Sequence, residues 1–177
     1  TCTECTPGLY SLSSNVASCS PCAPGKYQDQ SDQIGCINCG KGQYNNASGS
    51  AYAIDCKSCD PGFYSASLTA IECIKCDTGT AYPQPGAQAQ SYCTNCLKGK
   101  YNNEQGQANC KNCGTGKWGS QPAAASESVC KDCGKGTYND ETGSSTETDC
   151  KNCAKGRYNN QKGQSSPVNP GCVECGV

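Results

Sequence analysis

The 177-residue chain contains no histidine and no methionine, and only 15 of its residues are Leu, Ile, Val or Phe. Without histidine, the chain lacks the side chain that most often serves as a general base near neutral pH. The aliphatic content is far below that of a soluble globular domain. A conventional hydrophobic core therefore cannot hold this chain together.

Excess charge and long apolar runs are also missing. The net charge of −1 comes from 14 basic and 15 acidic residues, which form no basic run. We therefore expect neither nucleic acid nor an anionic membrane surface as a partner. No stretch approaches the about 18 apolar residues of a membrane-spanning helix, and the chain does not begin like a signal peptide. The sequence predicts no membrane span in this chain.

The sequence motifs of catalysis are absent as well. There are no paired carboxylates, no catalytic triad and no phosphate-binding loop, and the acidic residues are scattered over predicted turns. Scattered acids have no neighbours that could tune their pKa for proton transfer. We therefore predict that the chain is not an enzyme and that it uses no cofactor.

Cysteine, in contrast, is abundant. All 20 cysteines fall into ten Cys-x-x-Cys pairs, whose starts lie 17 to 22 residues apart. This self-similarity predicts a single tandem array over residues 1–177. Its nine repeats, called repeats 1 to 9 below, begin near residues 2, 19, 36, 56, 73, 93, 110, 130 and 150, and a partial repeat begins at residue 172.

A Cys-x-x-Cys pair can be a redox centre, half of a zinc site or part of a disulfide framework. Redox centres need a stabilised thiolate at the start of a helix, and no helical periodicity follows these pairs. A four-cysteine zinc scaffold fits the spacing better, but it would require five separate sites in a chain with almost no core. We favour disulfides, because short polar repeats with an even cysteine count are typical of oxidising compartments.

The residues after each pair repeat a turn signal. The third residue after the second cysteine, called the turn glycine below, is Gly8, Gly25, Gly42, Gly62, Gly79, Gly99, Gly116, Gly136 or Gly156. Proline precedes it in three repeats, and Pro-Gly is typical of a type II turn, in which the glycine has positive φ. In four repeats a lysine precedes it instead, and we expect these side chains to be solvated at the tip of the turn: Lys41, Lys98, Lys135 and Lys155.

An aromatic residue follows two positions after the turn glycine in eight repeats: Tyr10, Tyr27, Tyr44, Tyr64, Tyr101, Trp118, Tyr138 and Tyr158. We interpret these rings as packing groups rather than as a ladder of ligand contacts. Five residues further on, glycine, asparagine or aspartate predicts a second turn: Asn15, Asp32, Gly49, Gly106, Gly143 and Gly163. Segments such as QYNNAS at 43–48 are predicted to be brief strands of a hairpin, and helix is expected to be nearly absent.

The phrase Cys-x-x-Cys-x-Pro-Gly-x-Tyr, as in CSPCAPGKY (19–27) and CKSCDPGFY (56–64), resembles the ephrin-receptor-like cysteine-rich repeat. That repeat is itself similar to the smaller modules of tumour-necrosis-factor receptors. The resemblance covers the whole chain and implies an elongated, disulfide-linked rod that is secreted or lies on the extracellular face of the cell surface. The chain departs from it where Lys-Gly replaces Pro-Gly and where repeat 5 has Ala81 at the aromatic position.

These observations predict a small disulfide-rich fold, mostly irregular with short β-hairpins, arranged as an elongated tandem-repeat rod. The leading functional hypothesis is an extracellular structural protein of a stalk, fibre or surface coat. The alternative is the ectodomain of a receptor or adhesion protein that binds a protein or glycan along its side. The contact would then be sought in the least regular repeats, at residues 76–93 with Pro83 and Pro85, and around Trp118.

Two disulfide connectivities fit the spacing. The first joins the second cysteine of each pair to the first of the next pair, giving Cys5–Cys19, Cys22–Cys36, Cys39–Cys56, Cys59–Cys73, Cys76–Cys93, Cys96–Cys110, Cys113–Cys130, Cys133–Cys150 and Cys153–Cys172. The second crosses two pairs at a time, as in Cys2–Cys19 with Cys5–Cys22. We favour the first, because equivalent repeats should be closed equivalently. It leaves Cys2 and Cys175 for disulfides between repeats or molecules, so that copies or neighbouring repeats join head to tail.

One sequon for N-linked glycosylation occurs, at Asn46 in Asn46-Ala47-Ser48. It lies on a predicted turn, where an oligosaccharide could be accommodated at the surface. We predict a glycan at Asn46 in a secreted eukaryotic product.

Overall fold

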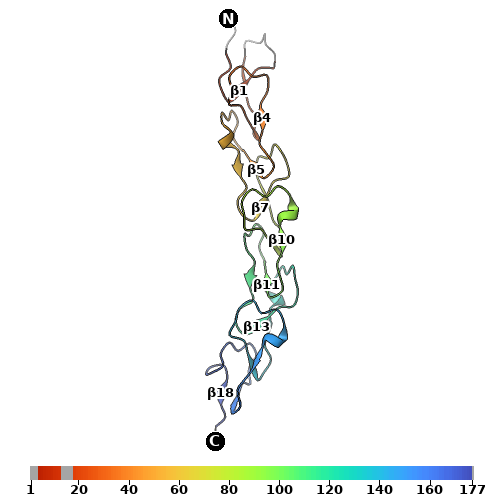
Figure 1. Ribbon diagram of the computed structural model, residues 1–177, viewed down its shortest axis with the longest axis vertical. Helices are drawn as coiled ribbons and strands as arrows, with labels where there is room; N and C mark the ends of the chain where they lie inside the picture. The colour runs from red at the N-terminus through yellow and green to blue at the C-terminus, as the bar shows by residue number, and fades with distance from the viewer. Residues whose placement is uncertain (1–3, 13–17, 177) are drawn as a thin grey trace. The chain divides into compact units, whose positions relative to one another are not determined.

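The computed structural model describes residues 4–12 and 18–176, and it divides into two compact units. Unit 1 comprises residues 1–76 and 82–93, and unit 2 comprises residues 77–81 and 94–177. Over the described residues, the regular structure consists of nine two-stranded antiparallel hairpins and four single-turn 3-10 helices, with no α-helix (Figure 1). The prediction of a disulfide-rich fold with short hairpins and almost no helix is confirmed.

Unit 1 holds four hairpins and two 3-10 helices. The hairpins are β1 (Leu9–Tyr10) with β2 (Ser20–Pro21), β3 (Lys26–Tyr27) with β4 (Ile37–Asn38), β5 (Gln43–Tyr44) with β6 (Lys57–Ser58), and β7 (Phe63–Tyr64) with β8 (Ile74–Lys75). The 3-10 helices are η1 (Ala53–Asp55) and η2 (Gln90–Tyr92).

Unit 2 holds five hairpins and two 3-10 helices. The hairpins are β9 (Thr80–Ala81) with β10 (Thr94–Asn95), β11 (Lys100–Tyr101) with β12 (Lys111–Asn112), β13 (Lys117–Trp118) with β14 (Lys131–Asp132), β15 (Thr137–Tyr138) with β16 (Lys151–Asn152), and β17 (Arg157–Tyr158) with β18 (Val173–Glu174). The 3-10 helices are η3 (Glu127–Val129) and η4 (Glu147–Asp149).

Each hairpin starts at the predicted turn. In repeat 1 the amide of Leu9 donates to the carbonyl of Thr6 at 3.0 Å, and Gly8 between them has a φ of 86°. This is the geometry that a Pro-Gly turn requires, and all nine turn glycines have positive φ. The turn glycines thus have the backbone conformation that the sequence predicts.

The strands are shorter than predicted. In the segment 43–48 only Gln43 and Tyr44 form a strand, and their partners are the two residues between the cysteines of the next pair. Each Cys-x-x-Cys pair therefore supplies the second strand of the hairpin that the preceding repeat begins. The ladder of each hairpin therefore crosses the boundary between two repeats.

The four 3-10 helices account for the repeats of 20 residues. They occur in repeats 3, 5, 7 and 8, which are 20 residues long, just before the first cysteine of the next pair. In η1 the carboxylate of Asp55 accepts from the amide of Tyr52 at 3.0 Å, and in η4 Asp149 accepts from Thr146 at the same distance. The three extra residues of a long repeat thus make one helical turn.

Backbone hydrogen bonds connect each repeat to the next in the same way. In unit 1 the amide of Gly25 donates to the carbonyl of Asn45 at 2.7 Å, and the amide of Gly49 donates to Cys22 at 2.8 Å. In unit 2 the amide of Gly116 donates to Asn139 at 2.7 Å. Neighbouring repeats are thus joined through their main chains.

Turn glycines also contact the repeat after the next one. A Cβ atom at Gly42 would collide with the carbonyl of Gly86, and one at Gly116 would collide with the carbonyl of Gly163. Both residues approached belong to second turns, two repeats further along. Glycine is therefore needed at these positions for close backbone approach as well as for positive φ.

The buried interior contains sulfur and small or polar groups. The buried apolar residues are cysteines and three alanines, namely Ala81, Ala87 and Ala124. Ile34, Ile54 and Leu97, in contrast, are more than 70% exposed. In the described part of the chain no Leu, Ile, Val or Phe side chain is buried, so cystine replaces the aliphatic core.

Candidate functional site

Nine disulfides connect all of the described cysteines except Cys175. They are Cys5–Cys19, Cys22–Cys36, Cys39–Cys56, Cys59–Cys73, Cys76–Cys93, Cys96–Cys110, Cys113–Cys130, Cys133–Cys150 and Cys153–Cys172. Every bond runs from the second cysteine of one pair to the first of the next. The structure therefore has the uniform connectivity and not the crossed one.

In repeats 2 to 8 the second cysteine of each pair is more deeply buried than the first. The second cysteine is at most 2% exposed in repeats 1 to 8, as in Cys22 and Cys113, whereas first cysteines such as Cys19 and Cys36 are half-buried. The second cysteine follows directly on the hairpin strand, and its amide donates to the preceding turn glycine, as in Cys22 to Gly8 at 2.9 Å. The strand pairing thus holds one sulfur of each disulfide in the interior.

These cysteines are not arranged as metal ligands. Within residues 4–12 and 18–176, no group of three or more His, Cys, Asp or Glu side chains could hold a metal ion. The sulfur atoms are engaged in disulfides instead. This arrangement argues against the four-cysteine zinc scaffold that the spacing left open.

A buried asparagine follows the aromatic position in four repeats, and sequence reasoning did not assign it a role. The side-chain amide of Asn139 donates to the carbonyl of Lys117 in the preceding repeat at 3.0 Å and to Ser144 Oγ at 2.8 Å. Its Oδ1 accepts from the amide of Glu141 at 3.1 Å. The equivalent side chains of Asn45, Asn102 and Asn159 likewise donate to the preceding repeat.

These asparagines act as polar cross-links between repeats. They are 0–7% exposed, and each side-chain amide donates a hydrogen bond in the interior. A buried amide must find such partners, because water cannot reach it. The sequence signal for this role was the recurring Tyr-Asn dipeptide. A polar residue that always follows a packed aromatic ring is expected to be held in place by a structural contact.

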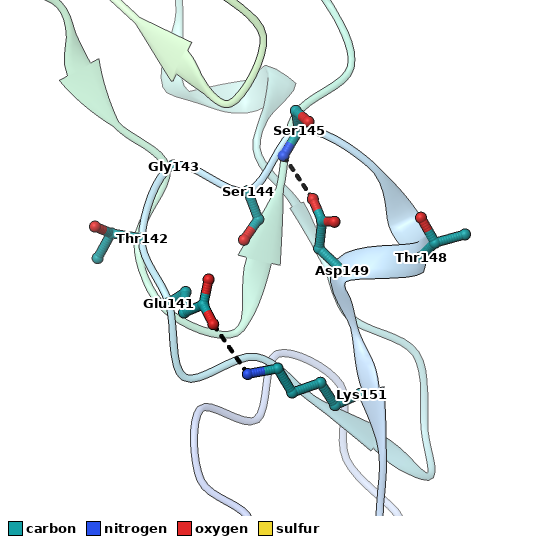
Figure 2. A pocket seen from close by; sticks show the side chains of 8 residues that line it. All are labelled: Glu141, Thr142, Gly143, Ser144, Ser145, Thr148, Asp149 and Lys151. Carbon is teal, nitrogen blue, oxygen red and sulfur yellow. Dashed lines mark hydrogen bonds and ion pairs between the residues drawn. The ribbon is translucent and has the colours of Figure 1, made fainter.

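Repeat 8 contains an open polar hollow of about 480 Å³, lined among others by Glu141, Ser144, Asp149 and Lys151 (Figure 2). Figure 2 shows Lys151 pointing toward Glu141, and the two are 3.0 Å apart, while Asp140 accepts from the same ammonium at 2.7 Å. These ion pairs join Asp140 and Glu141 of repeat 8 to Lys151 at the start of repeat 9, so the charges are already paired. Nothing in this lining resembles an acid–base pair poised for catalysis.

The ionisation of these groups follows from their contacts. The hydrogen bond from Lys151 lowers the pKa of Asp140, and the backbone amides of Thr146 and Ser145 lower the pKa of Asp149. The two carboxylates, Asp140 first and then Glu141, raise the pKa of Lys151. Each of these pKa shifts favours the charged form of the side chain, as expected for structural ion pairs.

The comparison with protein families is decisive for the identity of the repeat. The family described as tyrosine-protein kinase ephrin type A/B receptor-like matches residues 8–56 and 87–130. These two segments cover more than half of the chain. The chain belongs to this family. Ephrin-receptor-like repeats of this type are non-catalytic and occur in ectodomains, which together with the many disulfides indicates an extracellular location.

A search of curated proteins finds no match to this ephrin-receptor-like chain. In the described residues, none of the helices is long and apolar enough to cross a membrane.

The irregular repeats differ from the others in their aromatic contacts. In repeat 5 of this ephrin-receptor-like array, Ala81 is buried, and the ring of Tyr82 packs edge-on against Tyr92 with centroids 5.4 Å apart. In repeat 7 the ring of Trp118 lies below the ammonium of Lys131 from repeat 8, which is 5.3 Å from the ring centroid. At the aromatic position the other described rings are half-buried except Tyr158, which is 48% exposed.

The remaining predicted site residues lie apart from one another. Asn46 is exposed on the segment after β5, where a glycan would meet solvent. Cys175 is exposed and forms no disulfide in the described chain, and its amide donates to Gly156 at 2.9 Å. Cys2 lies outside the described residues. The glycan and the joining role of the two cysteines stay predictions.

Proposed function

We propose that this chain is an extracellular spacer, a segment of a stalk, fibre or surface coat built by adding ephrin-receptor-like repeats. The observation that carries the proposal is the repeat-to-repeat backbone bonding within each unit. Gly25 bonds to Asn45 as Gly116 bonds to Asn139, so one type of junction serves successive repeats. Arrays with nearest-neighbour contacts grow in length as repeats are added.

The chemistry of the surface supports a non-catalytic role. In the hollow of repeat 8, Lys151 is paired with Asp140 and Glu141. The carboxylate of Asp149 accepts hydrogen bonds from the amides of Ser145 and Thr146. Groups with these partners position backbone rather than exchange protons with a substrate. We therefore propose that the chain has no enzymatic activity of its own.

The second candidate is a receptor-type or adhesion ectodomain that binds a protein or glycan along its side. Membership in the ephrin-receptor-like family favours it. Unit 2 offers an open hollow of about 500 Å³ beside Trp118, lined also by Lys117, Lys131 and Glu147. An aromatic ring with charged neighbours is a common combination in recognition surfaces.

Cys2 and Cys175 are proposed to join copies or neighbouring repeats head to tail. Cys175 supports this role because its thiol is exposed and because it occupies the place of a second cysteine in its pair. A second cysteine bonds to the first cysteine of a following pair throughout the array. Such a heterologous contact can be repeated from copy to copy, which gives an open filament rather than a closed ring.

The spacer proposal is tested by shortening the chain. Deleting residues 110–149 removes repeats 7 and 8 and joins repeat 6 to repeat 9 with the cysteine spacing intact. Turn glycines contact the repeat two positions further along. Removing two repeats therefore still leaves odd-numbered repeats in contact with odd-numbered ones, and even-numbered with even-numbered. We expect the maximum dimension from small-angle X-ray scattering to fall by about 20 Å, at about 10 Å per repeat. An unchanged maximum dimension would refute the spacer proposal.

The ectodomain candidate is tested separately. Trp118→Ala should abolish attachment of the purified chain to cells or glycan-coated surfaces if the ring is a contact. The maximum dimension should stay unchanged in that variant. Attachment that persists in Trp118→Ala removes the reason for placing a binding site in repeat 7.

A further inference from the structure

The second residue after the aromatic, called the ring-plus-two position below, makes the same contact in two repeats. It is Asn46 in repeat 3, Asn103 in repeat 6 and Asp140 in repeat 8. In repeat 6 the ammonium of Lys111 donates to Oδ1 of Asn103 at 2.9 Å. In repeat 8 the ammonium of Lys151 donates to Oδ1 of Asp140 at 2.7 Å. A lysine thus holds this side chain in both repeats.

The two lysines show on which side of the hairpin the ring-plus-two side chain lies. Lys111 is directly opposite Tyr101 in the β11–β12 hairpin. Lys151 is directly opposite Tyr138 in the β15–β16 hairpin. Residues opposite one another in an antiparallel pair project from the same face. The ring-plus-two side chain, which bonds to the lysine, therefore lies on the same face of the hairpin as the ring.

Repeat 3 has the same framework, but its ring-plus-two position is open. Lys57 is directly opposite Tyr44, and Asn46 follows Tyr44 by two residues. The next residue is Ala47, whereas repeats 6 and 8 have a glutamate there that also bonds to the lysine. Among the described residues, Lys57 forms no ion pair and the Asn46 side chain forms no hydrogen bond. Asn46, the residue of the sequon, is therefore exposed and free to be modified.

The ring of Tyr44 is only partly covered by protein. It is half-buried and borders a hollow of about 200 Å³, which is lined also by Asp60, Phe63, Glu72 and Cys73. In the part of the chain that the structure describes, neither carboxylate of this hollow forms an ion pair. Aromatic rings with a few hydrogen-bond acceptors beside them suit a sugar, because its C–H groups pack on a ring and its hydroxyls donate.

We propose that the first sugar of an N-linked glycan on Asn46 packs against the ring of Tyr44 and stabilises the β5–β6 hairpin. In the attachment step, Nδ2 of Asn46 bonds to C1 of the N-acetylglucosamine of a lipid-linked oligosaccharide. The amide loses a proton, and the lipid pyrophosphate leaves. The sugar then starts two residues from Tyr44, on the face of the hairpin that carries the ring. This contact rests on the glycan predicted at Asn46 and is independent of the spacer role.

The test uses the whole chain secreted from cultured animal cells. Mass spectrometry measures how much of Asn46 is modified, and an endoglycosidase then trims the glycan to its first sugar. Asn46→Gln supplies the chain without a sugar. We expect hydrogen exchange in the β5–β6 hairpin to be about fivefold slower with the single sugar than in Asn46→Gln. The β11–β12 hairpin of unit 2 should exchange equally in both.

A substitution of the ring separates contact with Tyr44 from a general effect of a bulky substituent. Tyr44→Leu is measured with and without the sugar, so that each form is compared with its own reference whatever the substitution itself does to stability. The sugar should no longer slow exchange in Tyr44→Leu. Tyr27→Leu, which removes the half-buried ring of repeat 2, is the matched control and should keep the fivefold effect.

Four outcomes would overturn the proposal. The sugar has no effect on exchange in the otherwise unchanged chain, its effect persists in Tyr44→Leu, its effect is lost equally in Tyr27→Leu, or Asn46 is unmodified in the secreted material. None of them bears on the spacer proposal, which is decided by the maximum dimension of the shortened chain.

Discussion

At the scale of single residues, each turn glycine has two separate roles. Gly116 has a φ of 76° and lies against the carbonyl of Gly163, whereas Gly156 has a φ of 81° and has nothing within 4 Å of its Cβ position. The first residue thus combines backbone conformation with close approach, and the second requires conformation alone. The two roles can be measured separately.

We expect Gly156→Ala to lower the free energy of unfolding by about 1 kcal/mol, the cost of a left-handed backbone at a residue with a side chain. Gly116→Ala should lower it by about 3 kcal/mol, because the new methyl group also displaces the backbone of repeat 9. Urea unfolding of the oxidised chain, followed in unit 2 by hydrogen exchange, measures both. Equal losses would show that close approach has no energetic role.

The buried asparagines make a second prediction at this scale. Asn139→Ala should lower the free energy of unfolding by about 2 kcal/mol, because the carbonyl of Lys117 and the hydroxyl of Ser144 lose their partner in the interior. Asn160→Ala, at an exposed asparagine of repeat 9, should change it by less than about 0.5 kcal/mol. Comparable effects of the two variants would contradict the cross-linking role.

At the scale of elements, each hairpin depends on the disulfide that closes it. Cys113→Ser together with Cys130→Ser opens the bond between residues 17 apart in sequence, and the expected loss is about 3 kcal/mol. The loss should be confined to repeat 7 and its neighbours, because the backbone hydrogen bonds and close glycine approaches of the described residues reach no further than the second repeat along. Hydrogen exchange of unit 2 resolves this, and uniform loss of protection over both units would contradict a local role.

The 3-10 turn η4 should respond to acid. Backbone amides lower the pKa of Asp149 in the folded chain below its ordinary value of 3.8. The carboxylate therefore stabilises the fold fully when the pH is above the ordinary value. The stabilisation is lost as pH falls through the lower pKa of the folded state. The pKa of Asp140 is lowered as well, by Lys151 above all, so the ion pair between Asp140 and Lys151 weakens in the same acidic window.

We therefore expect the amides of Ser145 and Thr146 to keep constant protection from hydrogen exchange between about pH 7 and 4, after correction for intrinsic rates. Protection should fall below about pH 3.8. In Asp149→Asn it should already be reduced at neutral pH and show no acid step. An acid step of the same size in Asp149→Asn would assign the effect to another group.

At the scale of the whole molecule, cystine takes the place of the core. The interior of the described chain holds cysteines, three alanines and hydrogen-bonded amides, and none of its Leu, Ile, Val or Phe side chains is buried. Most of the free energy that orders the repeats must then come from cross-links and backbone hydrogen bonds. Such a chain should be resistant to heat while oxidised and should lose its order when reduced.

We expect a reducing agent to unfold the chain and a metal chelator to leave it unchanged. Circular dichroism and hydrogen exchange before and after each treatment measure the outcome, and non-reducing mass determination with thiol counting gives the number of free cysteines. The structure places one unpaired cysteine, Cys175, in its described part. Unfolding by the chelator would instead favour the zinc scaffold.

Local features of this protein could be predicted from the sequence alone. The Cys-x-x-Cys period, the turn glycines such as Gly8 and Gly25, and the shortage of aliphatic residues together indicate short disulfide-closed hairpins without a conventional core. These inferences succeed because a type II turn needs positive φ at one position and because cysteine spacing limits loop length. They concern residues that are close together in sequence.

The tertiary structure decided what depends on distant residues. Spacing left two disulfide connectivities open, and the structure has the one that closes each repeat alike. Three further features were not predicted. They are the pairing of Gln43 and Tyr44 with Lys57 and Ser58, the burial of Asn139, and the contact between a repeat and the second repeat along. The reason is physical: each depends on a backbone group 13 or more residues away, and no local pattern encodes which distant carbonyl a buried amide will meet.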